Sequence, residues 1–339
     1  MPFPDLALAP MEARLQDSLP DEGGWQFEPK WDGFRCLAFR DGGTVTLMSK
    51  GGKPLGRYFP EVVAGLDAVG GRWVLDGELI IPVGASLDFS ALQMRLHPAE
   101  SRIRRLAAET PAQLMLFDCL WDAGALLDRP LAERRLRLER WLAEHPSPTL
   151  RLSPATQDPA TARDWLASAG GALDGVVAKR LDQPYRAGER DMVKVKRMRT
   201  ADCVVGGFRY TSGARSVGSL LLGLYDDAGL LHHVGFTSGI AARERAALTA
   251  RLEPLIEAPG FTGDAPGGPS RWSTERSAAW QPLRADLIAE VRYDHVTGRR
   301  FRHGTRFLRW RPDKAPRQCT MDQLQEEARP AVVANALGA

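Results

Sequence analysis

Short apolar runs separated by polar turns dominate the first 200 residues. Runs rich in Val, Leu and Ile predict strands at residues 35–40, 44–49, 73–81, 114–121, 175–179 and 192–197. The segment Asp41-Gly42-Gly43 predicts a hairpin between the first two. Apolar positions three and four residues apart predict helices at 60–69, 88–96, 130–144 and 161–169. Pro130 suits the first turn of the third helix, and Thr161 or Asp158 is a candidate cap of the fourth.

The pattern changes after Arg199, where strands follow one another directly. Apolar alternation predicts strands at 201–210, 219–225, 230–236, 287–293 and 307–310, with a helix at 241–256. Residues 259–270 are rich in Gly and Pro, which predicts a loop. Five strands with one helix between the third and fourth are typical of an OB-fold barrel. We therefore expect two domains, 1–199 and 200–339.

Composition agrees with an ordinary globular protein. The 339 residues are 44% hydrophobic and 26% charged, which suits about two domains. The sequence contains no apolar run long enough for a membrane helix and no basic segment followed by an apolar core at its N-terminus. We expect a cytoplasmic protein that does not associate with membranes. The four cysteines form no Cys-x-x-Cys pair, which favours buried, reduced thiols over a zinc site or disulfides.

The basic side chains are unevenly distributed. The net charge is +3, and residues 1–200 carry equal numbers of basic and acidic side chains, so the excess lies in residues 201–339. There it concentrates in a stripe interrupted only by Asp294 and Asp313, formed by Arg292, Arg299, Arg300, Arg302, Arg306, Arg309, Arg311, Lys314 and Arg317. Such a stripe could neutralise nucleic-acid phosphates, and a solvated basic face explains it equally well.

Carboxylates and lysines recur at the ends of strand-like runs. Five segments share this arrangement: 28–35, 74–80, 114–118, 174–179 and 192–196. Buried charge is costly unless it is paired or binds a ligand. A chain that repeats the arrangement five times is expected to build a site for a charged ligand.

The order of these segments resembles that of the covalent nucleotidyltransferases, which include ATP-dependent DNA ligases, RNA ligases and mRNA capping enzymes. The chain is most similar to the small bacterial ATP-dependent DNA ligases, both the stand-alone ligase C type and the ligase domain of ligase D. The resemblance covers residues 25–324. It implies an α+β fold, with an ATP-grasp-like nucleotidyltransferase domain of largely antiparallel sheets followed by an OB-fold domain.

Three lysines are the candidate catalytic residues. Lys30, two residues before Asp32-Gly33, matches the lysine that forms a covalent bond to AMP in this family. A lysine is protonated at neutral pH and has to lose its proton before it attacks. Lys194 and Lys196 alternate with Val193 and Val195 along a strand, so both amines face one side. The resemblance implies that these two lysines hold the α-phosphate.

The resemblance also implies the remaining contacts to ATP. Glu28 matches the residue beside the adenine edge, Arg35 a contact to the nucleotide and the nick, and Phe117 the aromatic ring that stacks on adenine. Glu78 matches a ribose or metal contact.

Two positions depart from the family pattern. Asp174 matches a metal-binding position where many relatives have Glu, so the expected Mg²⁺ or Mn²⁺ site consists of Asp174 and Glu78. Lys50 replaces a frequent Arg and loses a bidentate donor. We assign Lys50 to DNA binding, together with Arg299, Arg300, Arg302 and Arg306.

Arg311 and Lys314 match the final motif of the family, which contacts the departing pyrophosphate. The expected function is therefore ATP-dependent sealing of nicked duplex DNA by a monomer associated with the bacterial nucleoid, in DNA repair. Any repair polymerase or end-binding protein would be a separate chain. An RNA ligase or a GTP-dependent capping-type enzyme is the main alternative, and a non-catalytic nucleic-acid-binding module is another.

Overall fold

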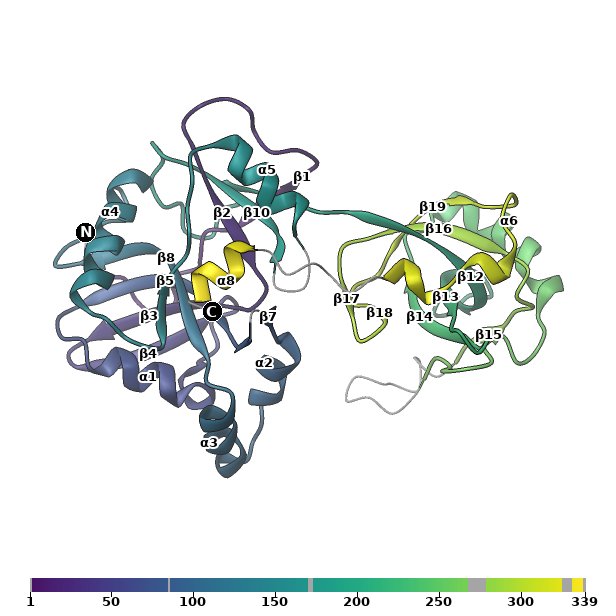
Figure 1. Ribbon diagram of the computed structural model, residues 1–339, viewed down its shortest axis with the longest axis horizontal. Helices are drawn as coiled ribbons and strands as arrows, with labels where there is room; N and C mark the ends of the chain where they lie inside the picture. The colour runs from purple at the N-terminus through teal and green to yellow at the C-terminus, as the bar shows by residue number, and fades with distance from the viewer. Residues whose placement is uncertain (1, 85, 170–172, 268–278, 325–330, 338–339) are drawn as a thin grey trace. The chain divides into compact units, whose positions relative to one another are not determined.

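The computed structural model describes residues 2–84, 86–169, 173–267, 279–324 and 331–337 (Figure 1). The described residues form two compact units. The first unit contains the residues up to Arg197 and the C-terminal helix α8 (Ala331–Leu337), and the second begins at Met198. In the described part of the chain, every helix is too short or too polar to span a membrane.

The larger sheet of the first unit has five strands. Their order is β4 (Thr44–Ser49), β3 (Phe34–Asp41), β5 (Trp73–Ile80), β8 (Gln113–Asp122) and β9 (Leu150–Leu152). All neighbours are antiparallel except β8 and β9. The structure confirms the predicted strands and the hairpin at Asp41-Gly42-Gly43. It adds β9, which is too short to show a period in the sequence.

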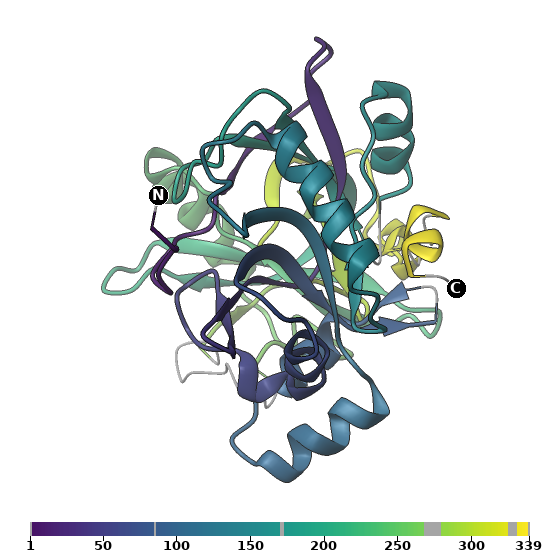
Figure 2. The ribbon, with the colours of Figure 1, turned by 90° about the vertical axis from the view of Figure 1, so that its left-hand side faces the viewer.

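Side chains of this sheet alternate between two cores. On one face, Cys36 and Leu75 pack with Val62 of helix α1 (Pro60–Asp67) and Trp141 of helix α4 (Leu131–Glu144). Figure 2 shows α4 in teal in front of the strands of this sheet. On the other face, Leu37, Phe39 and Val74 pack against Met11, Tyr185 and Met192, from the direction of the second sheet. The alternation thus places the sheet between a helical layer and another sheet.

The second sheet has the order β1 (Ala13–Gln16), β11 (Met192–Lys196), β10 (Leu173–Arg180) and β2 (Trp25–Trp31). Strands β1 and β2 are absent from the sequence-based prediction. Pro29 interrupts the apolar run of β2, and proline cannot donate to a sheet ladder. The structure resolves the conflict because β2 lies at the edge of the sheet, where it pairs with β10 on one side and forms an isolated bridge from Phe27 to Thr156 on the other.

The predicted helices are present with adjusted ends. Helix α4 begins one residue after Pro130, and helix α5 (Pro159–Ala167) is capped by Asp158, whose carboxylate accepts from the amides of Ala160 and Thr161. Helix α2 (Phe89–Arg95) follows a hairpin of β6 (Pro82–Val83) and β7 (Ser86–Leu87). Helix α3 (Glu100–Glu109) was not predicted, because its apolar stripe of Ile103, Leu106 and Ala107 is short and only Ile103 is buried.

The second unit contains the predicted OB-fold barrel. Its strand order is β14 (Leu231–Thr237), β13 (Val217–Tyr225), β12 (Arg199–Tyr210), β16 (Ile288–Tyr293) and β19 (Arg306–Trp310). A bridge between Thr237 and Thr305 joins the two ends of this order and closes the barrel. Along the chain, helix α6 (Ala242–Leu252) lies after β14 and before β16, as predicted. The predicted loop at 259–270 contains no helix or strand up to residue 267, and its last three residues lie outside the described chain.

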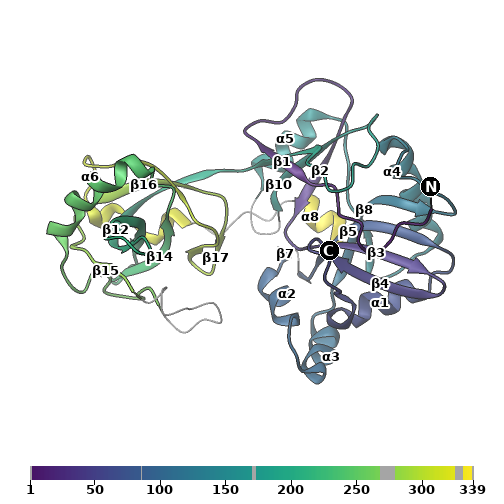
Figure 3. The ribbon, with the colours of Figure 1, turned by 180° about the vertical axis from the view of Figure 1, so that it is seen from behind.

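Helix α8 belongs to the first unit, whereas the sequence analysis placed residues 200–339 in the second domain. Figure 3 shows α8 among the strands of the first unit. Its Val333 is fully buried in a cluster with Trp31, Ile80, Met115 and Leu173. Trp31 and Leu173 directly neighbour Lys30 and Asp174 in the sequence. The C-terminal helix therefore completes the core beneath two of the candidate site residues.

Candidate active site

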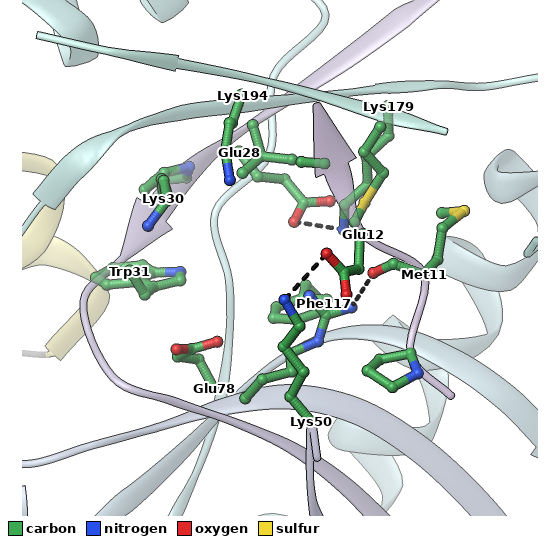
Figure 4. A pocket seen from close by; sticks show the side chains of 16 residues that line it. Met11, Glu12, Glu28, Lys30, Trp31, Lys50, Glu78, Phe117, Lys179 and Lys194 are labelled. Carbon is green, nitrogen blue, oxygen red and sulfur yellow. Dashed lines mark hydrogen bonds and ion pairs between the residues drawn. The ribbon is translucent and has the colours of Figure 1, made fainter. Parts of the chain in front are cut away.

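A cavity of about 210 Å³ opens between the two sheets of the first unit (Figure 4). It brings together seven residues singled out in the sequence: Glu28, Lys30, Arg35, Lys50, Glu78, Phe117 and Lys194. The sequence analysis did not assign its other lining residues, which include the segment from Pro10 to Ala13 and Lys179. Of these, only Lys179 carries a signal in the sequence, as the last residue of a charged segment at a strand end.

Lys30 lies on β2, and its amine is 2.6 Å from Oδ2 of Asp174. Lys196 is 3.6 Å from the same oxygen. Gly175 makes this approach possible. This residue of β10 lies opposite Lys30 of β2 and opposite Lys196 of β11. Its φ is +147°, and a Cβ there would lie 2.0 Å from the carbonyl oxygen of Val195. A side chain at position 175 would push β10 away from β11, the strand that carries Lys196.

Arg35 is anchored to a fully buried carboxylate. Its guanidinium donates two hydrogen bonds of 2.6 Å to Asp76, and the Tyr185 hydroxyl donates a third of 2.6 Å. Arg35 also donates to the Met11 carbonyl, and its guanidinium carbon lies 4.6 Å from the ring centroid of Phe117. The bidentate geometry fixes the guanidinium plane at the wall of the cavity.

Lys179 and Glu28 form a buried ion pair of 2.8 Å, and the carboxylate also accepts from Gln26. The Lys179 amine lies 4.3 Å from the ring centroid of Phe117. Two cationic side chains therefore contact the aromatic ring expected to stack on a base. A flat ligand stacked on Phe117 has to share the ring with Arg35 and Lys179.

Burial raises the pKa of Glu78 to about 7, although Arg35 and Lys30 oppose the shift. A cation placed beside such a carboxylate stabilises its ionised form.

Gly33, next to Asp32, is required by packing, because a Cβ there would lie 2.1 Å from the carbonyl oxygen of Leu79.

Lys194 differs from the other cations of the cavity. Burial, followed by the charges of Lys30, Lys196 and Lys50, lowers its pKa. Among the described residues it has no hydrogen-bond or ion-pair partner. Its amine is therefore available to an incoming anion.

Arg311 and Lys314 lie in the second unit, which is described separately from the cavity. Both bind the carboxylate of Asp202, at 2.9 and 2.5 Å, and Arg311 also binds Asp313 at 2.7 Å. These contacts raise the pKa of Arg311, chiefly through Asp313. The final motif is thus held by an acidic network of its own domain.

The residues predicted to bind DNA are not a single group. Lys50 lines the cavity of the first unit and pairs with Glu12 at 3.0 Å. In the second unit, Arg299 and Arg306 are exposed, and Arg302 is half-buried. Arg300 donates to Nδ1 of His233 at 2.8 Å, and burial lowers the pKa of His233 to about 3, so this ring is a neutral acceptor.

Metal-binding side chains are sparse. Within the described ranges, no three His, Cys, Asp or Glu side chains gather closely enough to hold a metal ion alone. The four cysteines are all buried and unpaired, as predicted.

Comparison with known families identifies the chain. A model described as "ATP dependent DNA ligase domain" matches residues 8–196, which is more than half of the sequence. A second, "ATP dependent DNA ligase C terminal region", matches residues 213–314. The chain belongs to the ATP-dependent DNA ligase family. The expected resemblance and the α+β fold with an OB-fold domain are therefore confirmed.

Two curated ligases align over nearly their full length. DNA ligase C1 of Mycolicibacterium smegmatis is 46% identical, covering 94% of this chain and 93% of that protein. DNA ligase C of Mycobacterium tuberculosis is 42% identical, covering 94% of each. A solved structure described under Lig E DNA ligases has a TM-score of 0.57 at 17% identity, covering 90% of this chain and 100% of that one. This last similarity shows a shared fold.

Proposed function

We propose that this ligase seals nicks in duplex DNA through a covalent adduct of AMP on Lys30. The amine of Lys30 attacks the α-phosphorus of ATP, a nitrogen–phosphorus bond forms and pyrophosphate leaves. The AMP group then passes to the 5′-phosphate at the nick and frees the lysine. The 3′-hydroxyl finally attacks that phosphate and expels AMP. The observation that carries the proposal is the shared cavity of Lys30, Phe117 and the unpaired Lys194.

Each residue has a role that follows from its contacts. Asp174, 2.6 Å from Lys30, positions the amine and can accept its proton. Lys194 faces the developing charge on the α-phosphate, and Lys196 assists from the same face of β11. Phe117 offers a surface for adenine, and Glu28 with Lys179 offers polar groups beside it. Positioning and charge stabilisation are the main sources of catalysis in phosphoryl transfer.

Glu78 and Asp174 suit a Mg²⁺ or Mn²⁺ ion because both provide oxygen donors. The raised pKa of Glu78 supports this assignment, since a cation would stabilise its ionised form. Two carboxylates leave coordination positions for water and phosphate oxygens, which Mg²⁺ commonly retains. When bound, the ion would neutralise charge on the phosphates.

Arg311 and Lys314 are proposed to contact pyrophosphate during the first step. Nicked duplex DNA would contact Lys50 in the first unit and Arg299, Arg300, Arg302 and Arg306 in the second. We assign the enzyme to DNA repair as a monomer at the bacterial nucleoid, with any polymerase or end-binding protein as a separate chain.

The test is retention of label after denaturation. Wild-type protein incubated with α-labelled ATP and Mg²⁺ or Mn²⁺ should retain label, and Lys30→Ala should not. A parallel reaction with labelled GTP separates a capping-type enzyme, which would prefer GTP. Sealing of nicks with DNA or RNA at each terminus then distinguishes a DNA ligase from an RNA ligase. Wild-type labelling of Lys30→Ala would overturn the assignment.

A further inference from the structure

Cations around the cavity are paired with carboxylates in four places. The pairs are Lys30 with Asp174, Arg35 with Asp76, Lys179 with Glu28, and Lys50 with Glu12. Three of these carboxylates are buried, with exposed fractions of 8%, 0% and 3%, whereas Glu12 is 28% exposed. Breaking a buried pair is costly, and an exposed pair is worth little. Of the four, the pair formed by Glu12 is therefore the one that an incoming anion can separate.

The backbone of Glu12 is held by hydrogen bonds, and its side chain is partly exposed. Its amide donates to the Glu189 carbonyl at 2.8 Å, and its carbonyl accepts from Met192 at 3.1 Å. The neighbouring Met11 amide donates to the Tyr185 hydroxyl at 2.8 Å. Figure 4 shows the Glu12 carboxylate directed toward Lys50 and joined to its amine by a dashed line. The carboxylate can therefore leave Lys50 by a change of rotamer, while its main chain stays in place.

Glu12 supplies negative charge to the cations near it. Its carboxylate is 3.0 Å from Lys50 and 3.5 Å from Arg190, and its charge opposes the lowered pKa of Lys194. The hydrogen bond from Lys50 lowers the pKa of Glu12, so the carboxylate is ionised at neutral pH. A polyphosphate that enters the cavity meets the same amines and is repelled by this carboxylate.

We propose that Glu12 is a displaceable counter-ion, which neutralises Lys50 until a polyphosphate takes its place. The proposal rests on the proposed function, because the polyphosphate is that of ATP. The carboxylate weakens the binding of ATP, and it weakens the binding of the pyrophosphate product by the same repulsion. Glu12 thereby limits inhibition by that product and sets the affinity of the site for polyphosphate.

Binding of inorganic tripolyphosphate to the full-length protein tests the proposal without requiring any chemistry. The variant Glu12→Gln keeps the shape of the side chain and removes its charge. Its Kd for tripolyphosphate, measured by titration calorimetry, should fall about two- to fivefold, the size expected for one partly exposed ion pair. The control Glu189→Gln removes the same charge from an exposed side chain outside the cavity and should leave Kd unchanged.

A second measurement separates repulsion from a direct contact. The KM for ATP in self-adenylation should fall with Glu12→Gln, inhibition by pyrophosphate should tighten, and the rate at saturating ATP should stay the same. A Glu12 that instead binds the nucleoside would raise the KM for ATP and leave tripolyphosphate binding unaltered. Unchanged or weaker tripolyphosphate binding by a folded Glu12→Gln protein would overturn the proposal, as would undetectable binding by the wild type. Glu12→Gln could bind tripolyphosphate more tightly while Lys30 of the wild type is not labelled by ATP. That result would overturn the proposed function and leave the counter-ion proposal standing.

Discussion

The amine of Lys30 lies 2.6 Å from the carboxylate of Asp174, although 144 positions separate the two residues in the chain. They meet because β2 and β10 are antiparallel neighbours and Gly175 lets β11 approach closely. Asp174 is one methylene shorter than a glutamate would be, and its carboxylate ends at the amine that we propose as the nucleophile.

Replacing Asp174 should therefore affect the first chemical step. Asp174→Ala leaves Lys30 and Lys196 without their shared anion, and we expect self-adenylation to slow by about 10²-fold or more. Asp174→Glu restores the carboxylate and should keep substantial activity. Single-turnover labelling with ATP at limiting metal measures both. Wild-type rates for a folded Asp174→Ala protein would show that another group orients the lysine.

Glu78 should make stability depend on pH in an identifiable direction. Its pKa is about 7 in the folded protein, above the usual value of 4.5. Between these values the folded state binds more protons than the unfolded state, so the contribution of Glu78 to the free energy of unfolding falls as pH rises from about 4.5 to about 7. Urea unfolding of the wild type and Glu78→Gln at pH 5 and pH 7.5 measures the difference. From pH 5 to pH 7.5, the free energy of unfolding of the wild type should fall relative to that of Glu78→Gln. Equal changes in both proteins would contradict the assigned pKa.

Arg311 should separate the steps of the reaction. Pyrophosphate departs only in the first step, so Arg311→Ala should lose self-adenylation yet still seal a nick that already carries 5′-linked AMP. Arg309, exposed on β19 two residues before Arg311 and paired with Glu290, provides a control whose replacement by Ala should preserve adenylation. If Arg311 serves DNA binding instead, adenylation survives and sealing of the adenylated nick becomes weaker and more salt-sensitive.

Helix α8 should stabilise the first unit despite its place at the end of the chain. Val333→Ala removes two methyl groups from the cluster with Trp31 and Leu173, and we expect a loss of about 2 kcal/mol in the free energy of unfolding. Val332→Ala, at a half-buried position of the same helix, should cost less. Denaturant unfolding compares the two variants, and equal stability of Val333→Ala and the wild type would show that the helix does not hold this core.

Features that depend on local pattern can be predicted from the order of the residues alone. Alternating apolar residues predict most strands of both domains, because a strand with one buried face has to repeat every second residue. The same alternation places Lys194 and Lys196 on one face of β11. The order of charged strand ends also identifies the family, and seven of the residues named on that basis line one cavity.

Which charged side chains form ion pairs depends on how the chain folds. The pairs Lys179–Glu28, Lys50–Glu12 and Arg311–Asp202 join distant segments, and each depends on strand register and on side-chain packing. The edge position of β2, which accommodates Pro29, and the return of α8 to the first unit are set in the same way. An ion pair leaves no periodic trace in the chain, because its energy comes from the proximity of two atoms that folding brings together.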